Sequence, residues 1–205
     1  MSRVSERIRT PVLVCLIALP GLLMTPAVSP ALQETPPDRE AEDHGQSAAG
    51  SAQRAPAIEI LNARHPLPGI LTGGQPTREQ LTAAAEAGYR TVVNLRGRRE
   101  TAGGEEAALA EELGLRYFAI PIAGSEDLSE ENARQLAAVL AEEGNYPVLV
   151  HCASGNRVGA LLAVKAYYAD GKDGDEALAI GLEAGLANLE PKVRRILRLP
   201  PSLQD

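Results

Sequence analysis

Aromatic residues and cysteine are scarce in this chain of 205 residues, which contains no Trp, one Phe and two Cys. The lack of aromatic rings leaves no stacking platform for nucleic-acid bases. The net charge of −7 and the shortness of the basic clusters also argue against nucleic-acid binding. No CxxC or HExxH motif and no internal repeat is present, so the sequence predicts neither a metal site nor a cofactor.

Residues 1–31 have the pattern of a secretory signal. Arginines at the start precede an apolar run over residues 12–24, and small residues follow it. The run contains Pro20 and is shorter than the roughly 20 apolar residues of a membrane span. We therefore expect a cleaved signal peptide, with an uncleaved N-terminal anchor as the alternative. Both outcomes predict a periplasmic or secreted domain, with membrane contact only if the segment is retained.

Residues 32–57 are rich in Pro, Glu, Asp, Ser and Ala and have little to bury, which predicts a disordered linker. Residues 58–205 are then the folded domain. Removal of the signal also removes Cys15, so Cys152 remains as the only cysteine and no internal disulfide can form. An unpaired thiol in an oxidising compartment indicates a reactive rather than a structural role.

The domain alternates between strand-like and helix-like segments, which is typical of an α/β fold. Short apolar or β-branched runs predict strands at residues 57–61, 70–72, 90–95, 116–120 and 148–150. Helical spacing and cap residues predict helices at residues 77–88, 105–113, 129–144, 157–169, 175–186 and 191–199. The sequence therefore predicts an α/β three-layer sandwich with a central, mainly parallel sheet.

One segment, residues 147–159 with the sequence PVLVHCASGNRVG, combines the features of an oxyanion site. An apolar strand runs into Cys152, a loop containing Gly155 follows, and Arg157 opens the next helix. Backbone N–H groups in a tight loop at a helix N-terminus bind anions, and the same field stabilises a thiolate there. Arg157 offers a planar fork of donors suited to phosphate or sulfate. The segment predicts a nucleophilic thiol in an anion-binding loop.

A basic cluster follows another predicted strand. Ligands of parallel α/β sheets bind beyond the carboxyl ends of the strands, where both Cys152 and residues 94–99 lie. If the two strands are close in the sheet, Arg96, Arg98 or Arg99 lines the same pocket as Cys152. The alternative is that the cluster is only a solvated turn of charges.

The motif HCASGNR resembles the signature loop of the Cys-dependent phosphatases, and the order of elements before it resembles their dual-specificity branch. More specifically, GGQPT (residues 73–77), TVVNLR (91–96) and VHCASGNRVGAL (150–161) are similar to the bacterial beta-lactamase-hydrolase-like phosphatase family. The resemblance extends over roughly residues 58–186. It implies a cysteine-phosphatase-like fold and a phosphatase of the protein tyrosine or dual-specificity type.

By this resemblance, Cys152 is the nucleophile that forms a phosphocysteine. His151 orients the loop and favours the thiolate, or else only satisfies the end of a strand. Gly155 permits close backbone approach or a positive φ. The phosphoryl oxygens are bound by Arg157 and by the backbone amides of the loop, which comprises Ala153, Ser154, Gly155 and Asn156.

The loop departs from the usual phosphatase length, because four residues rather than five separate Cys152 from Arg157. The shorter length is that of rhodanese-like sulfurtransferases, in which the cysteine carries a persulfide. A smaller ring of amides suits a sulfane sulfur and crowds a phosphate. Ser154 offers a hydroxyl donor in partial compensation, since Val158 occupies the place where many phosphatases have Ser or Thr.

Cleavage of a phosphate ester benefits from a general acid that protonates the leaving oxygen, and the sequence offers two candidates for it. Asp127 and Glu126 lie on a loop upstream of Cys152, and either is a candidate. The alternative is that they are acidic residues before a helix N-terminus, where negative charge is stabilising anyway.

The first hypothesis is therefore a phosphatase that acts on a phosphomonoester, either a phosphorylated protein or a small molecule. The second is a sulfurtransferase of rhodanese type on the same loop. The third is a binding module that retains the oxyanion site and lacks turnover. Tight phosphate or sulfate binding without turnover would distinguish the third from the first two.

Overall fold

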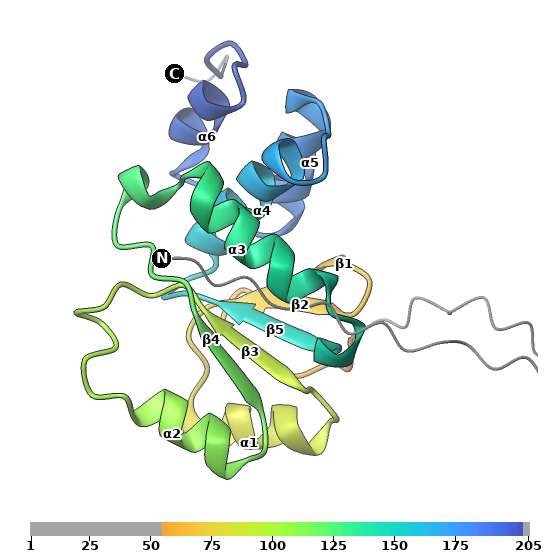
Figure 1. Ribbon diagram of the computed structural model, residues 1–205, viewed down its shortest axis with the longest axis vertical. Helices are drawn as coiled ribbons and strands as arrows, with labels where there is room; N and C mark the ends of the chain where they lie inside the picture. Colours follow the sequence, from red (N-terminus) through yellow and green to blue (C-terminus); the bar gives the residue numbers. More distant parts are fainter. Residues whose placement is uncertain (1–54, 203–205) are drawn as a thin grey trace, which may run out of the picture. The chain divides into compact units, whose positions relative to one another are not determined.

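The domain is built on a five-stranded sheet. The computed structural model describes residues 55–202, and within them the strands are ordered β1-β2-β5-β3-β4 (Figure 1). Only β1 is antiparallel to its neighbour, and the other three pairings are parallel. The strands are β1 (Arg64–Leu67), β2 (Ile70–Gly73), β3 (Thr91–Asn94), β4 (Arg116–Ala119) and β5 (Val148–His151). The predicted mainly parallel sheet is confirmed.

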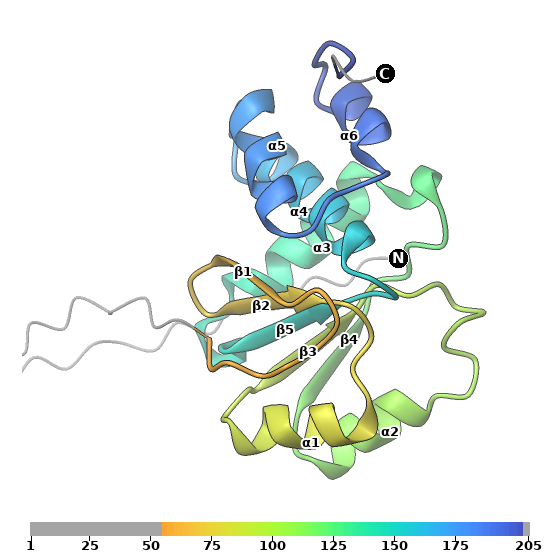
Figure 2. The ribbon, with the colours of Figure 1, turned by 180° about the vertical axis from the view of Figure 1, so that it is seen from behind.

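Helices cover both faces of the sheet (Figures 1 and 2). One face carries α1 (Arg78–Glu86) and α2 (Glu105–Glu112), and the other carries α3 (Glu130–Ala141) and α4 (Asn156–Tyr168). Beyond α4 lie α5 (Gly174–Glu183) and α6 (Glu190–Ile196). Each face has its own apolar cluster, one with α1 and α2 and one with α3 to α6. The three-layer α/β sandwich is as predicted.

The central strand β5 sends its side chains alternately to the two clusters. Val148 and Val150 belong to the cluster under α3 and α4, whereas Leu149 belongs to the cluster under α1 and α2. Successive residues of a strand face opposite sides of a sheet. His151 therefore faces α1 and α2, and Cys152, which belongs to the cluster of the other face, lies on the α4 side. This alternation separates the two side chains at the centre of the site.

Local sequence signals account for the helix ends. Thr77 caps α1 in a capping box, in which its hydroxyl accepts from Gln80 N at 3.2 Å and Gln80 Oε1 accepts from Thr77 N at 2.9 Å. Ser129 caps α3 with a single bond, in which its hydroxyl accepts from Asn132 N at 3.2 Å. Gly88 follows α1 with a φ of 89°, the left-handed conformation expected of a glycine after a helix.

The strand predicted at residues 57–61 is wrong, because the first strand, β1, begins at Arg64. The apolar residues of the predicted segment dock on α1 instead: Ile60 is buried in the cluster that includes α1, and Gln80 Nε2 donates to Glu59 O at 2.7 Å. A segment buried against a helix has the same short apolar pattern as a strand in a sheet. The pattern therefore predicted a strand where the chain packs on α1.

Ala55, which lies in the predicted linker, is buried. The hydroxyl of Tyr89 donates to Pro56 O at 2.6 Å, so this part of the predicted linker lies against the fold. The predicted signal or anchor, residues 1–31, lies outside the described residues. None of the helices within residues 55–202 is long and apolar enough to cross a bilayer.

Candidate active site

Three strand ends meet at the site. In the parallel register, Gly73 of β2 and Asn94 of β3 both lie beside His151, the last residue of β5. The residues that follow these strands are therefore neighbours at one edge of the sheet. This places the loop after β3, which contains the predicted basic cluster, beside the loop that begins with Cys152.

Cys152 is buried, with 1 % of its surface exposed, at the floor of its loop. Its Sγ accepts a hydrogen bond from the backbone N–H of Gly155 at 3.1 Å. An N–H aimed at the sulfur stabilises the negative charge of a thiolate. Gly155 has a φ of 94°, a backbone conformation that other residues rarely adopt, so glycine is the residue that permits this turn.

Segments outside the loop fix its peptide planes. Gln75 N donates to Ala153 O at 3.3 Å, and Asn62 Nδ2 donates to Ser154 O at 2.9 Å. Asn156, a predicted binding residue, uses its side-chain Oδ1 to accept from Ala187 N at 2.8 Å. Because the carbonyl groups of Ala153 and Ser154 are bonded to residues outside the loop, the N–H groups of the loop can point toward a bound anion.

Arg157 lies in the first turn of α4 and is clamped by Glu100. Its Nη1 donates to Glu100 Oε2 at 2.6 Å and its Nη2 to Glu100 Oε1 at 2.9 Å, a two-point fork. Nη1 also donates to Ile122 O at 2.8 Å. The pKa of Arg157 is raised, chiefly by the Glu100 hydrogen bonds and further by the neighbouring Cys152. The guanidinium is thus held in place beside the thiol.

Glu100 was not singled out in the sequence, although it closes the NLRGRRE segment of which only the arginines were considered. Hydrogen bonding to Arg157 lowers its pKa to about 2, and the Gly97 N–H at 2.8 Å contributes further. Arg96, predicted to line the substrate pocket beside Cys152, donates through Nη2 to the backbone O of Glu100 at 2.6 Å. In this structure Arg96 therefore supports the residue that holds Arg157.

His151 is completely buried and bonded to a second carboxylate that sequence reasoning missed. Its Nε2 lies 2.8 Å from Glu106 Oε1, in the first turn of α2. Asn94 Nδ2 donates to the same Glu106 oxygen at 2.9 Å and to the hydroxyl of Tyr117, also at 2.9 Å. The histidine before the nucleophile is thus part of a buried polar network.

The two candidate acids differ in their surroundings. Asp127 Oδ2 accepts from Ala123 N at 2.8 Å and from Gly124 N at 3.1 Å, which caps a short 3₁₀ turn. Glu126 points to Lys192 Nζ at 3.2 Å, and this contact lowers the pKa of Glu126. Asp127 lines a cleft with Glu100, whereas Glu126 does not line it. Of the two, Asp127 is the one that the structure brings toward the site.

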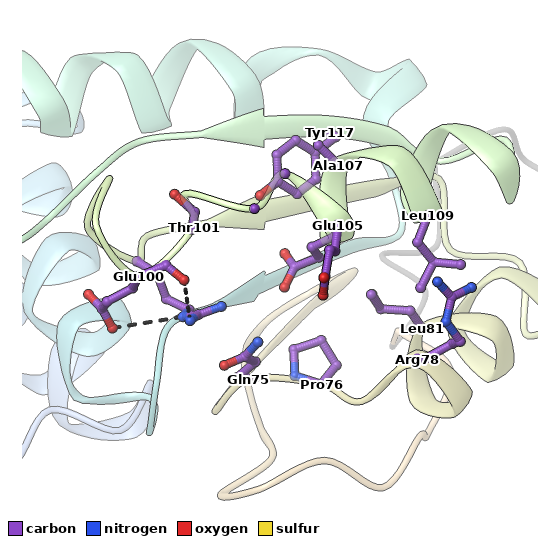
Figure 3. A pocket seen from close by; sticks show the side chains of 14 residues that line it. Gln75, Pro76, Arg78, Leu81, Glu100, Thr101, Glu105, Ala107, Leu109 and Tyr117 are labelled. Atoms are coloured by element: carbon purple, nitrogen blue, oxygen red, sulfur yellow. Dashed lines mark hydrogen bonds and ion pairs between the residues drawn. The ribbon is translucent and has the colours of Figure 1, made fainter.

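The site is flanked by two hollows. A pocket of about 270 Å³ lies between α1 and α2, with Arg78 and Leu81 on one wall and Glu105 on the other (Figure 3). The other is the cleft that contains Asp127, and it is lined by Gly97, Arg98, Arg99, Glu100, Pro121, Ala123, Asp127, Glu131, Asn132 and Gln135. Arg98 and Arg99 therefore lie in the hollow that adjoins Arg157. Within residues 55–202, no three His, Cys, Asp or Glu side chains are grouped to hold a metal ion.

The site thus combines a thiol at the carboxyl end of a central parallel strand with an arginine in the first turn of the next helix, and comparison with known proteins gives the class of protein. Residues 62–187 match the model of the family described as "DSP-PTPase phosphatase fused to NAD+ Kinase". The match extends over more than half of the chain, and the chain belongs to this family. The predicted dual-specificity branch is confirmed.

Curated relatives agree with the resemblance found in the sequence. The chain is 33 % identical over 116 residues to the "Beta-lactamase hydrolase-like protein" of Xylella fastidiosa, strain Temecula1, and equally to that of strain 9a5c. The aligned region is 55 % of this chain and 26 % of each relative, so the chain spans about a quarter of their length. The phosphatase prediction is favoured over the sulfurtransferase alternative by this family assignment.

Solved structures share the fold. The core catalytic domain of the PP-IP phosphatase SIW14 from S. cerevisiae has a TM-score of 0.51 at 17 % identity, over 68 % of this chain and 85 % of that one. TpbA of P. aeruginosa in complex with phosphotyrosine has a TM-score of 0.50 at 20 % identity, over 73 % and 91 %. Tk-PTP in its active form has a TM-score of 0.52 at 22 % identity, over 66 % and 95 %. The cysteine-phosphatase-like fold is confirmed.

Proposed function

We propose that the protein hydrolyses phosphomonoesters through a phosphocysteine on Cys152. The observation that carries the proposal is that the Cys152 sulfur has both a backbone N–H donor and a fixed guanidinium beside it. The sulfur accepts the Gly155 N–H at 3.1 Å, and the Arg157 guanidinium is held beside it by Glu100. A buried thiol with an oriented N–H and an oriented guanidinium suits attack on a dianionic phosphoryl group.

In the first step the thiolate of Cys152 attacks phosphorus. The S–P bond forms and the bond from phosphorus to the leaving oxygen breaks, with the electron pair going to that oxygen. The loop amides and Arg157 hold the three non-bridging oxygens as the charge redistributes among them. The clamp from Glu100 fixes the guanidinium before the substrate arrives, so little reorganisation is needed.

In the second step water attacks the phosphorus of the phosphocysteine. The O–P bond forms, the S–P bond breaks, and its electron pair returns to sulfur, which regenerates the thiolate. Inorganic phosphate leaves with the proton balance taken by solvent or by the residue that served as acid in the first step.

Asp127 is our proposed acid, because it lines the cleft that contains Glu100 and so faces the side of Arg157. The Asp127→Asn variant retains the amide contacts of the 3₁₀ turn through its side-chain oxygen and lacks the transferable proton. We expect kcat for a poor leaving group to fall about 100-fold and the basic limb of the pH–rate profile to flatten. An unchanged profile would show that Asp127 only caps the turn.

The chemistry of the site supports a class of substrate, the phosphomonoesters. TpbA was solved with phosphotyrosine and SIW14 is a PP-IP phosphatase. We propose a phosphorylated protein or a small phosphomonoester as substrate of this chain. An exported location remains our proposal from residues 1–31, and cell fractionation followed by mass determination of the mature N-terminus tests it.

The direct test is phosphate release from a generic aryl phosphate by the reduced protein, compared with Cys152→Ser. Release by the wild type that is abolished in the variant supports the proposal. If the folded protein binds inorganic phosphate and releases none from the ester, the site is a binding module and the proposal fails.

A further inference from the structure

Glu106 contacts the last residue of β5 from the face of the sheet opposite to the thiol. Its Oε1 lies 2.8 Å from Nε2 of His151, the residue that directly precedes Cys152. The side chain of His151 is fully buried, and that of Glu106 is 13 % exposed. The contact of Glu106 at this point of the site is with the histidine and not with the thiol.

Both ring nitrogens of His151 face oxygen acceptors. Nε2 faces the Glu106 carboxylate, and Nδ1 lies 3.4 Å from the backbone carbonyl oxygen of Cys152. A neutral imidazole has one N–H and can donate to only one of them, whereas the doubly protonated ring donates to both. A doubly protonated ring would satisfy both acceptors, with the 2.8 Å contact at Nε2 the shorter of the two.

The Glu106 carboxylate is arranged as the counter-ion. Its Oε1 also accepts from Asn94 Nδ2 at 2.9 Å, so this oxygen is an acceptor toward two donors. Its Oε2 is buried with no hydrogen-bond partner among the described residues, so a proton placed there would find no acceptor. A buried positive charge needs such a partner to be stable.

The other polar groups around the pair come from β3, the loop that follows it, and β4. Asn94 Nδ2 also donates to the Tyr117 hydroxyl, whose pKa is raised by burial and by the nearby Glu106. The backbone N–H of Arg96 donates to Asn94 Oδ1 at 2.8 Å and so fixes the amide orientation. The positive charge of Arg96 also acts on this network, since it opposes the rise in the pKa of Tyr117. Of the charged groups named, Glu106 is the one in direct contact with the ring.

We propose that Glu106 is a positioning residue that holds His151 doubly protonated beside Cys152 and thereby increases the fraction of Cys152 present as thiolate. The consequence for turnover rests on the proposed phosphatase function. The consequence for the thiol does not, because only the thiolate reacts rapidly with an alkylating reagent. The inference can therefore be tested in the absence of any phosphoester.

The experiment measures the rate of Cys152 alkylation by iodoacetamide against pH in the full chain, for wild type, Glu106→Gln and Glu105→Gln. Gln at position 106 retains an acceptor oxygen for His151 Nε2 and removes the charge. We expect alkylation at pH 6 to slow roughly tenfold and the profile to move to higher pH. Glu105→Gln removes the same charge from an exposed neighbour in the same helical turn and should leave the profile in place.

Superimposed profiles for wild type and Glu106→Gln would overturn the inference. A second measurement keeps it falsifiable if the variant does not fold: ¹⁵N chemical shifts of the wild-type His151 ring at pH 7, where we expect two protonated nitrogens. A ring with one protonated nitrogen would overturn the inference. If the alkylation shift is found and wild type releases no phosphate, the proposed function fails and the role of Glu106 in the thiol's ionisation stands.

Discussion

At the scale of the residue, the site depends on two pairs, Arg157 with Glu100 and His151 with Glu106. The motif residues Arg157 and His151 were predicted because they lie within a few positions of Cys152 along the chain. Their carboxylate partners lie 57 and 45 residues away in sequence. Nothing local in the sequence connects a loop carboxylate or a helical carboxylate to a distant loop, so only the fold shows these contacts.

The Glu100 clamp predicts a pH dependence of stability. The folded-state pKa of Glu100 is about 2, below its ordinary value of 4.5, because the Arg157 hydrogen bonds favour the charged form. A carboxyl group whose pKa is lowered on folding stabilises the folded state at pH values above its ordinary pKa. For Glu100 this stabilisation is lost as the pH falls from 4.5 toward 2. We expect Glu100→Gln to be less stable than wild type at pH 6 and the difference to shrink between pH 4.5 and pH 2.

Urea denaturation of both proteins at several pH values measures this difference in the free energy of unfolding. We also expect kcat/KM of Glu100→Gln to be about tenfold lower, because the guanidinium loses its fixed orientation. Glu86→Gln, which makes the same change at an exposed position on α1, serves as the control. A difference in stability that does not vary with pH would show that the clamp is not what Glu100 contributes.

At the scale of the element, helix α4 joins the nucleophile loop to a tightly packed contact with α5. It starts at the nucleophile loop and packs closely on the end of α5: a Cβ on Gly159 would lie 2.1 Å from Leu186 N and 2.6 Å from Gly181 O. Both contacts are with backbone, which cannot move aside as a flexible side chain can. The small residue at position 159 thus sets the spacing of α4 and α5.

Gly159→Ala should destabilise the domain by about 2–4 kcal/mol, since the backbones of α4 and α5 must separate to admit the methyl group. Equilibrium urea denaturation gives the value. Gly103→Ala is the matched control, because its nearest neighbour is the flexible side chain of Glu105 at 3.6 Å. Equal losses in the two variants would contradict the close-packing explanation.

Helices whose ends are defined by cap residues could be predicted from the sequence. A segment whose conformation depends on tertiary contacts could not. Thr77 and Ser129 identify the starts of α1 and α3 through cap bonds within four residues. The apolar residues around Ile60 were assigned to a strand, yet they are buried by α1 and its surroundings. An apolar pattern indicates burial without indicating what covers it.

At the scale of the whole molecule, strand order assembles the site. Parallel pairing of β5 with both β2 and β3 brings together the residues that follow Gly73, the loop that begins with Cys152, and the segment that contains Glu100. The alternation of strands and helices predicted this class of sheet, and the match of residues 62–187 to a phosphatase family agrees with it. The order of the strands was not available from the pattern, because many orders satisfy the same alternation.

The central claim is that phosphoryl transfer passes through Cys152, and rapid-quench trapping of the intermediate tests it most directly. Wild-type protein is mixed with an aryl phosphate, quenched within the first turnover by denaturant at alkaline pH, where the S–P bond is stable, digested at alkaline pH and analysed by mass spectrometry. We predict a phosphoryl group on the peptide that contains Cys152, formed and lost at rates consistent with turnover, and absent from Cys152→Ser. Turnover without this adduct, or with phosphate on another residue, would contradict the account.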